Sequence, residues 1–208
     1  MNFDPAQFTD NYLPEDPDQS IARERGVELG INDATPGSGA YLCYIASLIS
    51  AQSVVEIGTG SGVGTLWLLK GVMNSGVITT IDPEVQHTQI AKQILVEADI
   101  APNRYRLITS EYLEVMRKLA DRAYDLVVFR GNPEHILDVI DEAHRILRVG
   151  GILAIDHFFG GGKVPDPAQR DPKTIALRDA GKFLKSQSEI WSISLNPIGD
   201  AVLLATKL

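Results

Sequence analysis

The chain has 208 residues, which suits a single domain, and 44% of them are hydrophobic and 22% charged. Its formal net charge of −8 argues against a sequence-independent nucleic-acid-binding protein and against binding to an anionic membrane surface. The single cysteine, Cys43, excludes an intrachain disulfide and a cysteine-based zinc site. No apolar run reaches the roughly 18 residues of a membrane-spanning helix, and the first residues lack the features of a secretory signal. We therefore expect a cytoplasmic protein without nucleic-acid or membrane partners.

The first 20 residues differ in composition from the rest of the chain. Residues 1–20 hold five acidic side chains and three prolines, but neither Lys nor Arg. This composition predicts an N-terminal arm, or a short helix, outside the core of a main domain at 21–208. Two interpretations are open. The segment is either a solvated tail or an arm that covers the substrate site or a partner subunit.

From residue 40 onward, two sequence patterns alternate. Short apolar runs rich in β-branched residues predict buried strands, and segments with apolar residues three and four apart predict helices between them. The strands are predicted at Ser53–Ile57, Val77–Ile81, Tyr105–Thr109, Leu126–Phe129 and Ile152–Ile155. The helices are predicted at Tyr41–Ser50, Gly62–Val72, Pro83–Ala98, Glu111–Ala120 and Pro133–Leu147. This alternation is typical of right-handed crossovers and of a parallel sheet with helices on both faces.

The end of the chain breaks the alternation. Ile190–Leu195 and Ala201–Thr206 are two strand-like runs joined by Asn-Pro-Ile-Gly-Asp, which leaves no room for a helix. They predict a hairpin, and therefore one antiparallel strand in an otherwise parallel sheet. A plain dinucleotide-binding fold does not usually end in this way.

A glycine-rich segment follows the first predicted strand. It reads Glu-Ile-Gly-Thr-Gly-Ser-Gly-Val-Gly from Glu56, and an apolar helix comes next. Such a turn lets a ligand approach the backbone and the free N–H groups of a helix start. A dinucleotide fingerprint counted from Gly58 requires glycine at position 63, where this chain has Val63. The alternative is a glycine-rich turn without a ligand.

Asp82 supports a nucleoside ligand. It closes the second predicted strand in Thr-Ile-Asp-Pro, beside the glycine loop, where a carboxylate can accept both ribose hydroxyls. The alternative role is that of N-cap for the following helix, because Pro83 is well suited to the first helical position. The two roles are compatible.

Together, these features resemble the class I S-adenosylmethionine-dependent methyltransferases, which have a Rossmann-like fold. Three segments narrow the resemblance to the small O-methyltransferases, the family of catechol and caffeoyl-CoA O-methyltransferases: TPGSGAYL from Thr35, YDLVVF from Tyr124 and RVGGILAID from Arg148. The resemblance implies an α/β fold with a seven-stranded, mainly parallel sheet that has one antiparallel strand and helices on both faces. It also implies a homodimer and methyl transfer from S-adenosyl-L-methionine to a hydroxyl of a small-molecule acceptor, with phenols among the candidates.

The resemblance also implies a set of cofactor contacts. They are Ala34, Glu56, Gly58, Thr59, Gly60, Ser61, Gly62, Asp82, Ser110, Glu111 and Arg130. By analogy with the family, the glutamate and the glycine loop surround the methionine and ribose, and Asp82 accepts the ribose hydroxyls. Ser110 and Glu111 flank the adenine, and Ala34 touches the methionine end. The segment at Arg130 forms the other wall.

The chain departs from the family where a divalent cation usually binds. The family places acidic ligands after the fourth and fifth strands, but this chain reads Arg-Gly-Asn-Pro from Arg130 and Asp-His from Asp156. A guanidinium has no lone pair to offer and repels a cation, so only Asp156 remains as a ligand. The lysine often taken as the family's base falls at Pro133. We therefore expect no metal site.

Three residues are candidates for replacing the cation: Arg130, Asp156 and His157. Arg130 could lower the pKa of a bound hydroxyl as a fixed positive charge, or could simply pair with Asp156. His157 could act as general base, or could merely pack at the end of a strand. Gly160–Val164 is expected to form a mobile lid.

Two other functions compete with methyl transfer. One is an S-adenosylmethionine-binding protein that has lost catalysis, because both the metal site and the base are altered. The other is a nucleotide-dependent oxidoreductase, which Val63 and the terminal hairpin disfavour. The remaining histidines, His87, His135 and His144, are expected on the solvated surface.

Overall fold

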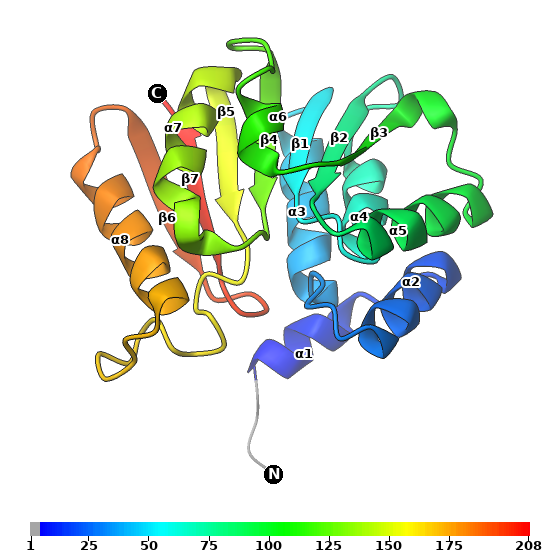
Figure 1. Ribbon diagram of the computed structural model, residues 1–208, viewed down its shortest axis with the longest axis horizontal. Helices are drawn as coiled ribbons and strands as arrows, with labels where there is room; N and C mark the ends of the chain where they lie inside the picture. Colours follow the sequence, from blue (N-terminus) through cyan, green and yellow to red (C-terminus); the bar gives the residue numbers. More distant parts are fainter. Residues whose placement is uncertain (1–4) are drawn as a thin grey trace.

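The computed structural model describes residues 5–208 and contains one seven-stranded sheet (Figure 1). The strands are β1 Ser53–Ile57, β2 Val77–Asp82, β3 Tyr105–Thr109, β4 Tyr124–Phe129, β5 Leu147–Ile155, β6 Trp191–Asn196 and β7 Val202–Lys207. Their order across the sheet is β3-β2-β1-β4-β5-β7-β6. β1 to β5 pair in parallel, whereas β7 is antiparallel to both β5 and β6. The predicted sheet, with one antiparallel strand, is confirmed.

The helices are α1 Pro5–Tyr12, α2 Pro17–Glu28, α3 Pro36–Leu48, α4 Val63–Gly71, α5 Val85–Glu97, α6 Tyr112–Met116, α7 Ile136–Ile146 and α8 Pro172–Ser186. Two short 3-10 turns, η1 Pro102–Arg104 and η2 Pro133–His135, precede β3 and α7. Each of the five predicted helices is present. The sequence analysis missed α8, although Asp171 accepts a hydrogen bond from the Thr174 N–H as its N-cap and Pro172 follows at the first position.

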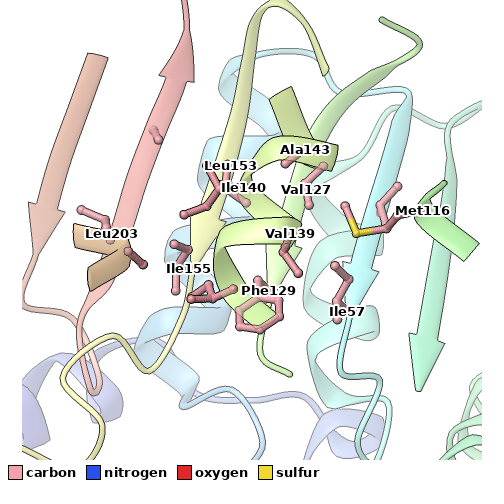
Figure 2. Packing of buried hydrophobic residues seen from close by; sticks show 14 of the residues in the cluster. Ile57, Met116, Val127, Phe129, Val139, Ile140, Ala143, Leu153, Ile155 and Leu203 are labelled. Atoms are coloured by element: carbon pink, nitrogen blue, oxygen red, sulfur yellow. The ribbon is translucent and has the colours of Figure 1, made fainter. Parts of the chain in front are cut away.

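Alternate residues of each central strand point to opposite faces of the sheet. One face packs against α6, α7 and α8, as Figure 2 shows for Val127, Phe129 and Leu153 around Ile140 of α7. The other face packs against α3 and α4 through a second set that includes Leu126. Burial on both faces explains why these strands read as continuous apolar runs rather than as alternating ones. Each fully buried aliphatic side chain contributes about 1.5–3 kcal/mol relative to an exposed one.

The register of the parallel strands places the functional residues at one edge of the sheet. Ile57, Phe129 and Ile155 end β1, β4 and β5 side by side. The next residues continue the pairing: the Arg130 N–H donates to the Ile57 carbonyl at 2.8 Å, and the Asp156 N–H donates to the Phe129 carbonyl at 3.0 Å. In Figure 1, β5 points toward the side of the molecule where α1 and α2 lie. The carboxyl edge of the sheet is therefore the edge that these two helices approach.

The N-terminal helices are tied to the main body by polar contacts. Asp10 accepts a hydrogen bond from the backbone N–H of Gly37 in α3, and Glu15 accepts one from the indole of Trp67 in α4. Asp16 caps α2 and pairs with Lys70 at 2.8 Å. Helix α2 runs across residue 20, where the boundary between arm and domain is predicted, and residues 1–4 lie outside the described range. The division into an arm at 1–20 and a domain at 21–208 stays a prediction.

Candidate active site

The glycine loop after β1 adopts backbone conformations that demand glycine. Gly58, Gly60 and Gly62 have φ angles of +89°, +55° and +93°. A Cβ atom on Gly58 would also lie only 3.0 Å from the carbonyl of Arg130. The loop brings the backbone of β1 against that of β4, and the residues that follow it at the start of α4 are buried.

The carboxylate of Asp82 is buried beside this loop. Its Oδ2 accepts the Gly60 N–H at 3.0 Å, and its Oδ1 accepts the Glu84 N–H at 3.0 Å. The N-cap of α5 is Glu84, so the alternative prediction that Asp82 caps this helix is wrong. Asp82 instead accepts a hydrogen bond within the turn that precedes the helix. The prediction for His87 is wrong: its Nδ1 lies 3.2 Å from both carboxylate oxygens, and its side chain is only 27% exposed. This contact was missed because it crosses the turn between β2 and α5.

A cavity of about 490 Å³ opens in front of Asp82. Of the predicted cofactor contacts, Gly58, Asp82, Glu111 and Arg130 line this cavity. Tyr112 and His87 also line it and were not among the predicted contacts. The other predicted contacts do not line it. Glu56, Thr59, Gly60, Ser61 and Gly62 are buried in β1 and its loop, and Ala34 is buried just before α3. The Ser110 N–H donates to the Asp82 carbonyl. A carboxylate that lines an open cavity can accept hydrogen bonds from the hydroxyls of a ribose.

Glu56 is fully buried and saturated by protein groups. Its Oε2 accepts hydrogen bonds from Thr65 and, at 2.8 Å, from Thr80, while its Oε1 accepts one from the Arg130 guanidinium. Burial raises the pKa of Glu56, against the opposing influence of the Arg130 charge and the two threonine hydroxyls. A ligand can therefore reach this carboxylate only by replacing one of these contacts.

Arg130 bridges the ends of three strands. Its side chain is 4% exposed, and its guanidinium contacts Glu56 and, at 3.5 Å, Asp156. The expected pairing with Asp156 is present, but the pairing with Glu56 is closer. Gly64 makes room for the guanidinium, because a Cβ atom at that position would lie 2.1 Å from its Nη2. Arg130 lines both the cavity at Asp82 and a second cavity beyond β4 and β5.

Asp156 and His157 stand at the second cavity. Asp156 accepts the His157 N–H at 2.9 Å and the hydroxyl of Ser38 at 3.1 Å. His157 has a φ angle of +53°, an uncommon conformation for a residue other than glycine. Its Nε2 lies 3.1 Å from the carbonyl oxygen of Asp33, which can only accept. A neutral His157 therefore carries its proton on Nε2 and keeps the lone pair on Nδ1.

The second cavity measures about 360 Å³ and is lined by both apolar and polar residues. Phe129, Pro133 and Leu177 supply the apolar lining. The polar lining includes His157 and Asp156 together with Asn32, Asn132, Lys163 and Lys173. This volume suits a small molecule with a flat apolar part and a polar group turned toward His157.

The loop expected to be a mobile lid is held by α8. The guanidinium of Arg178 donates to the backbone carbonyls of Lys163, Val164, Asp166 and Gln169. The Gly161 N–H also donates to a carboxylate oxygen of Asp200, at 2.6 Å. Arg178 is a residue of the site that the sequence analysis missed along with its helix. Mobility of this loop stays a prediction.

The donors at the carboxyl edge do not suit a hard divalent cation. Across residues 5–208, no group of three His, Cys, Asp or Glu side chains is arranged to hold a metal ion. The space between Glu56 and Asp156 contains the guanidinium of Arg130. A hard cation would need several oxygen ligands there and would meet a fixed positive charge instead.

Comparisons with known proteins point to one family. The sequence model of the O-methyltransferase family matches residues 22–208. A probable O-methyltransferase of Mycobacterium tuberculosis is 41% identical over 195 residues, which cover 94% of this chain and 87% of that protein. A relative in Mycobacteroides abscessus is 42% identical over 195 residues, which cover 94% of this chain and 90% of the relative.

Solved structures share the fold. A protein from Corynebacterium glutamicum superposes with a TM-score of 0.88 and 28% identity, over 97% of this chain and 94% of that chain. An O-methyltransferase from Streptomyces achromogenes, solved in complex with SAM and involved in tomaymycin synthesis, gives a TM-score of 0.83 and 24% identity, over 97% and 94% of the two chains. Between residues 5 and 208, no helix combines the length and the apolar character needed to cross a membrane.

Proposed function

The chain belongs to the O-methyltransferase family, whose members use S-adenosylmethionine, and on that premise we propose that it methylates a hydroxyl of a small acceptor without a divalent cation. The observation that carries the proposal is the position of Arg130. This residue stands where the family has an acidic ligand after the fourth strand, its guanidinium contacts Glu56 and Asp156, the one acidic ligand position that is kept, and it lines both cavities.

The cavity at Asp82 is the proposed cofactor site. Two of the lone pairs of the Asp82 carboxylate are used by backbone N–H groups, so ribose hydroxyls would share the remaining ones with His87. Gly58 brings the loop backbone close to the ligand, and Glu111 and Tyr112 line the far end. When bound, S-adenosylmethionine supplies a methyl group on a sulfonium, which is a good leaving group.

His157 is the proposed general base. The Asp33 carbonyl fixes its proton on Nε2, so Nδ1 is free to take the proton of the acceptor hydroxyl. Asp156 accepts the backbone N–H of His157 and thereby holds the strained turn after β5. The acceptor would pack its apolar part on Phe129 and Leu177.

Arg130 would take over part of the cation's electrostatic role. Its single positive charge is shared by two buried carboxylates, so it lessens, without reversing, the negative potential that a developing acceptor anion would meet at the second cavity. A doubly charged cation about 4 Å from the guanidinium would raise the energy by about 8 kcal/mol at an effective dielectric constant near 20. Of the family's acidic ligand positions only Asp156 is kept, so one carboxylate would have to hold the cation against that repulsion.

Methyl transfer in the presence of EDTA tests the proposal. We expect the protein to methylate at least one member of a panel of phenols and enols with labelled S-adenosylmethionine, at the same rate with EDTA and with added Mg²⁺. Activity that EDTA abolishes and Mg²⁺ restores would refute the metal-free reaction. Cofactor binding without turnover across the panel would favour a catalytically altered binding protein, and binding of NAD in its place would favour an oxidoreductase.

The role of His157 has a separate test. His157→Gln is expected to lower kcat by about 10²–10⁴-fold at neutral pH. The loss should shrink as pH rises toward the pKa of the acceptor hydroxyl, because an acceptor that ionises by itself needs no base. A kcat that falls equally at every pH would assign His157 a packing role.

We also propose that the protein is a homodimer in the cytoplasm. Tyr12 of α1 is 70% exposed, and Tyr44 and Leu48 of α3, against which α1 packs, are 62% and 64% exposed. An apolar face of this kind is typical of an interaction site. Light scattering at micromolar concentration should give twice the chain mass, and Tyr44→Glu should give a monomer. A wild-type monomer would contradict the proposal, and the cytoplasmic location stays a prediction from the sequence.

A further inference from the structure

The carboxylate of Asp33 has no part in the mechanism above, yet it is built into the cofactor loop. Asp33 lies between α2 and α3, and its Oδ1 accepts the Ser61 N–H at 3.0 Å. Two glycines make room for it. A Cβ atom on Gly60 would lie 2.2 Å from Oδ1, and one on Gly26 would lie 2.2 Å from Oδ2. The chain thus forms a slot that holds this carboxylate against the loop.

No cation compensates the charge of Asp33 at close range. Among the described residues, no Lys, Arg or His nitrogen lies within 4.0 Å of its carboxylate. The two guanidiniums that influence it, Arg130 and Arg23, are paired with other carboxylates. Burial raises the pKa of Asp33, although hydrogen bonding from Ser61 and the charges of these two arginines oppose the shift. The carboxylate is therefore partly dehydrated and has no cationic partner within 4.0 Å.

The neighbourhood of Asp33 is negative overall. Asp33, Glu56 and Asp156 lie around the single guanidinium of Arg130, so the carboxyl groups here outnumber the cation. A cationic ligand at the glycine loop would relieve this excess, and a neutral ligand of the same shape would not.

We propose that Asp33 makes the site prefer the cationic sulfonium donor over its neutral product. S-adenosylmethionine and S-adenosylhomocysteine differ only in one methyl group and the positive charge that it confers on sulfur. A fixed carboxylate at the loop attracts the sulfonium and gains nothing from the thioether. This inference rests on the proposed use of S-adenosylmethionine and adds a specificity-determining residue that promotes release of the spent cofactor.

Binding calorimetry of the Asp33→Asn variant tests the inference without any turnover. The amide keeps the shape of the side chain and an oxygen for the Ser61 N–H, but it removes the charge. We expect affinity for S-adenosylmethionine to fall about tenfold and affinity for S-adenosylhomocysteine to change less than about twofold. Sinefungin, an analogue with an amine in place of the sulfonium methyl, should weaken together with S-adenosylmethionine, because both carry the charge.

Asp125→Asn is the matched control. Asp125 also accepts two backbone N–H groups, from Gln52 and Ser53, but it lies at the amino edge of the sheet. The same substitution there should leave the ratio of the two affinities unchanged. Asp33→Ser supplies a second neutral variant should Asp33→Asn melt below the assay temperature.

Each outcome decides something. If Asp33→Asn weakens the binding of all three ligands equally, Asp33 only supports the loop. If it leaves all three affinities unchanged, the charge of Asp33 does not act on the ligands. Both results overturn the inference while the proposed function stands. Wild-type protein that binds none of the three ligands would refute the proposed function, and this inference with it.

Discussion

Gly64→Ala is expected to destabilise the protein, although the same change in an ordinary helix does the opposite. Gly64 lies in the first turn of α4, and alanine there should stabilise the helix by about 0.5–1 kcal/mol from propensity alone. The added methyl group would lie 2.1 Å from Nη2 of Arg130 and 2.7 Å from Oε1 of Glu56. Both are far closer than van der Waals contact, so the guanidinium must move.

The expected loss of stability follows from the carboxylate of Glu56, which loses its partner when the guanidinium of Arg130 moves. Glu56 is completely buried, and its Oε1 has the guanidinium as its partner, while Thr65 and Thr80 hold the other oxygen. Separating a buried ion pair so that one charge is uncompensated costs about 3–5 kcal/mol. After the gain in helix propensity is subtracted, Gly64→Ala should lower the free energy of unfolding by about 2–4 kcal/mol.

A double-mutant cycle in chemical denaturation separates this cause from a general packing defect. Arg130→Met alone should cost a similar amount, because it also leaves Glu56 unpaired. In the Arg130→Met background, Gly64→Ala should cost less than about 1 kcal/mol, since the group that it displaces is already gone. If the two changes add fully, the methyl group does not act through the guanidinium and the reasoning is refuted.

Three further predictions concern the cofactor site, the sheet and the loop after β5. Asp82→Ala should weaken S-adenosylmethionine binding by roughly 1.5–3 kcal/mol for each ribose hydrogen bond lost, and unchanged affinity in calorimetry would remove Asp82 from the site. Burial alone would raise the pKa of Asp125, but hydrogen bonds from Arg148, Ser53 and Gln52 outweigh it and hold that pKa below its usual range. Asp125→Asn should therefore lower the free energy of unfolding by about 1–2 kcal/mol at neutral pH. The difference from wild type should fade as the pH falls below about 4, through the pKa of Asp125 in the folded state. A difference that persists in denaturation curves measured at acid pH would contradict this. Arg178→Ala should increase hydrogen exchange in 163–169 and raise the acceptor KM with little change in cofactor affinity, whereas unchanged exchange would show that the loop does not depend on α8.

Much of the fold was predictable because burial on both faces of a parallel sheet leaves a clear pattern. Three of the five residues of the strand Ser53–Ile57 are apolar and β-branched, and its observed bounds equal the predicted ones. Helix α8 was missed because a single apolar stripe, with Leu177 and Leu184 buried, is interrupted by charged residues on the solvent side. Strand β5 begins at Leu147, whereas the predicted strand begins at Ile152, because Arg148 and two glycines interrupt the apolar pattern in its first half.

The candidate site was less predictable because its key contacts join distant segments. Arg130 and Glu56 lie 74 positions apart in the sequence, and only the adjacency of β1 and β4 brings them together. The pairing of His87 with Asp82 depends on how the chain turns between a strand and a helix, which periodicity does not describe. Residue types at strand ends can be read from the sequence, whereas the partner of each charge requires the order of the strands.

The antiparallel direction of β7 has a consequence for how the protein is made. Because β7 runs opposite to β5, the turn before it lies at the carboxyl edge of the sheet, where Ala201 and Asp200 accept the N–H groups of Phe158 and Phe159. A Cβ atom on Gly199 of the same turn would lie 2.5 Å from Oγ1 of Thr35, so this turn also packs closely against the start of α3. The nascent chain can pair β1, β2 and β4 and form the glycine loop long before this turn leaves the ribosome. This part of the carboxyl edge is therefore completed by residues that are synthesised after all five parallel strands β1 to β5.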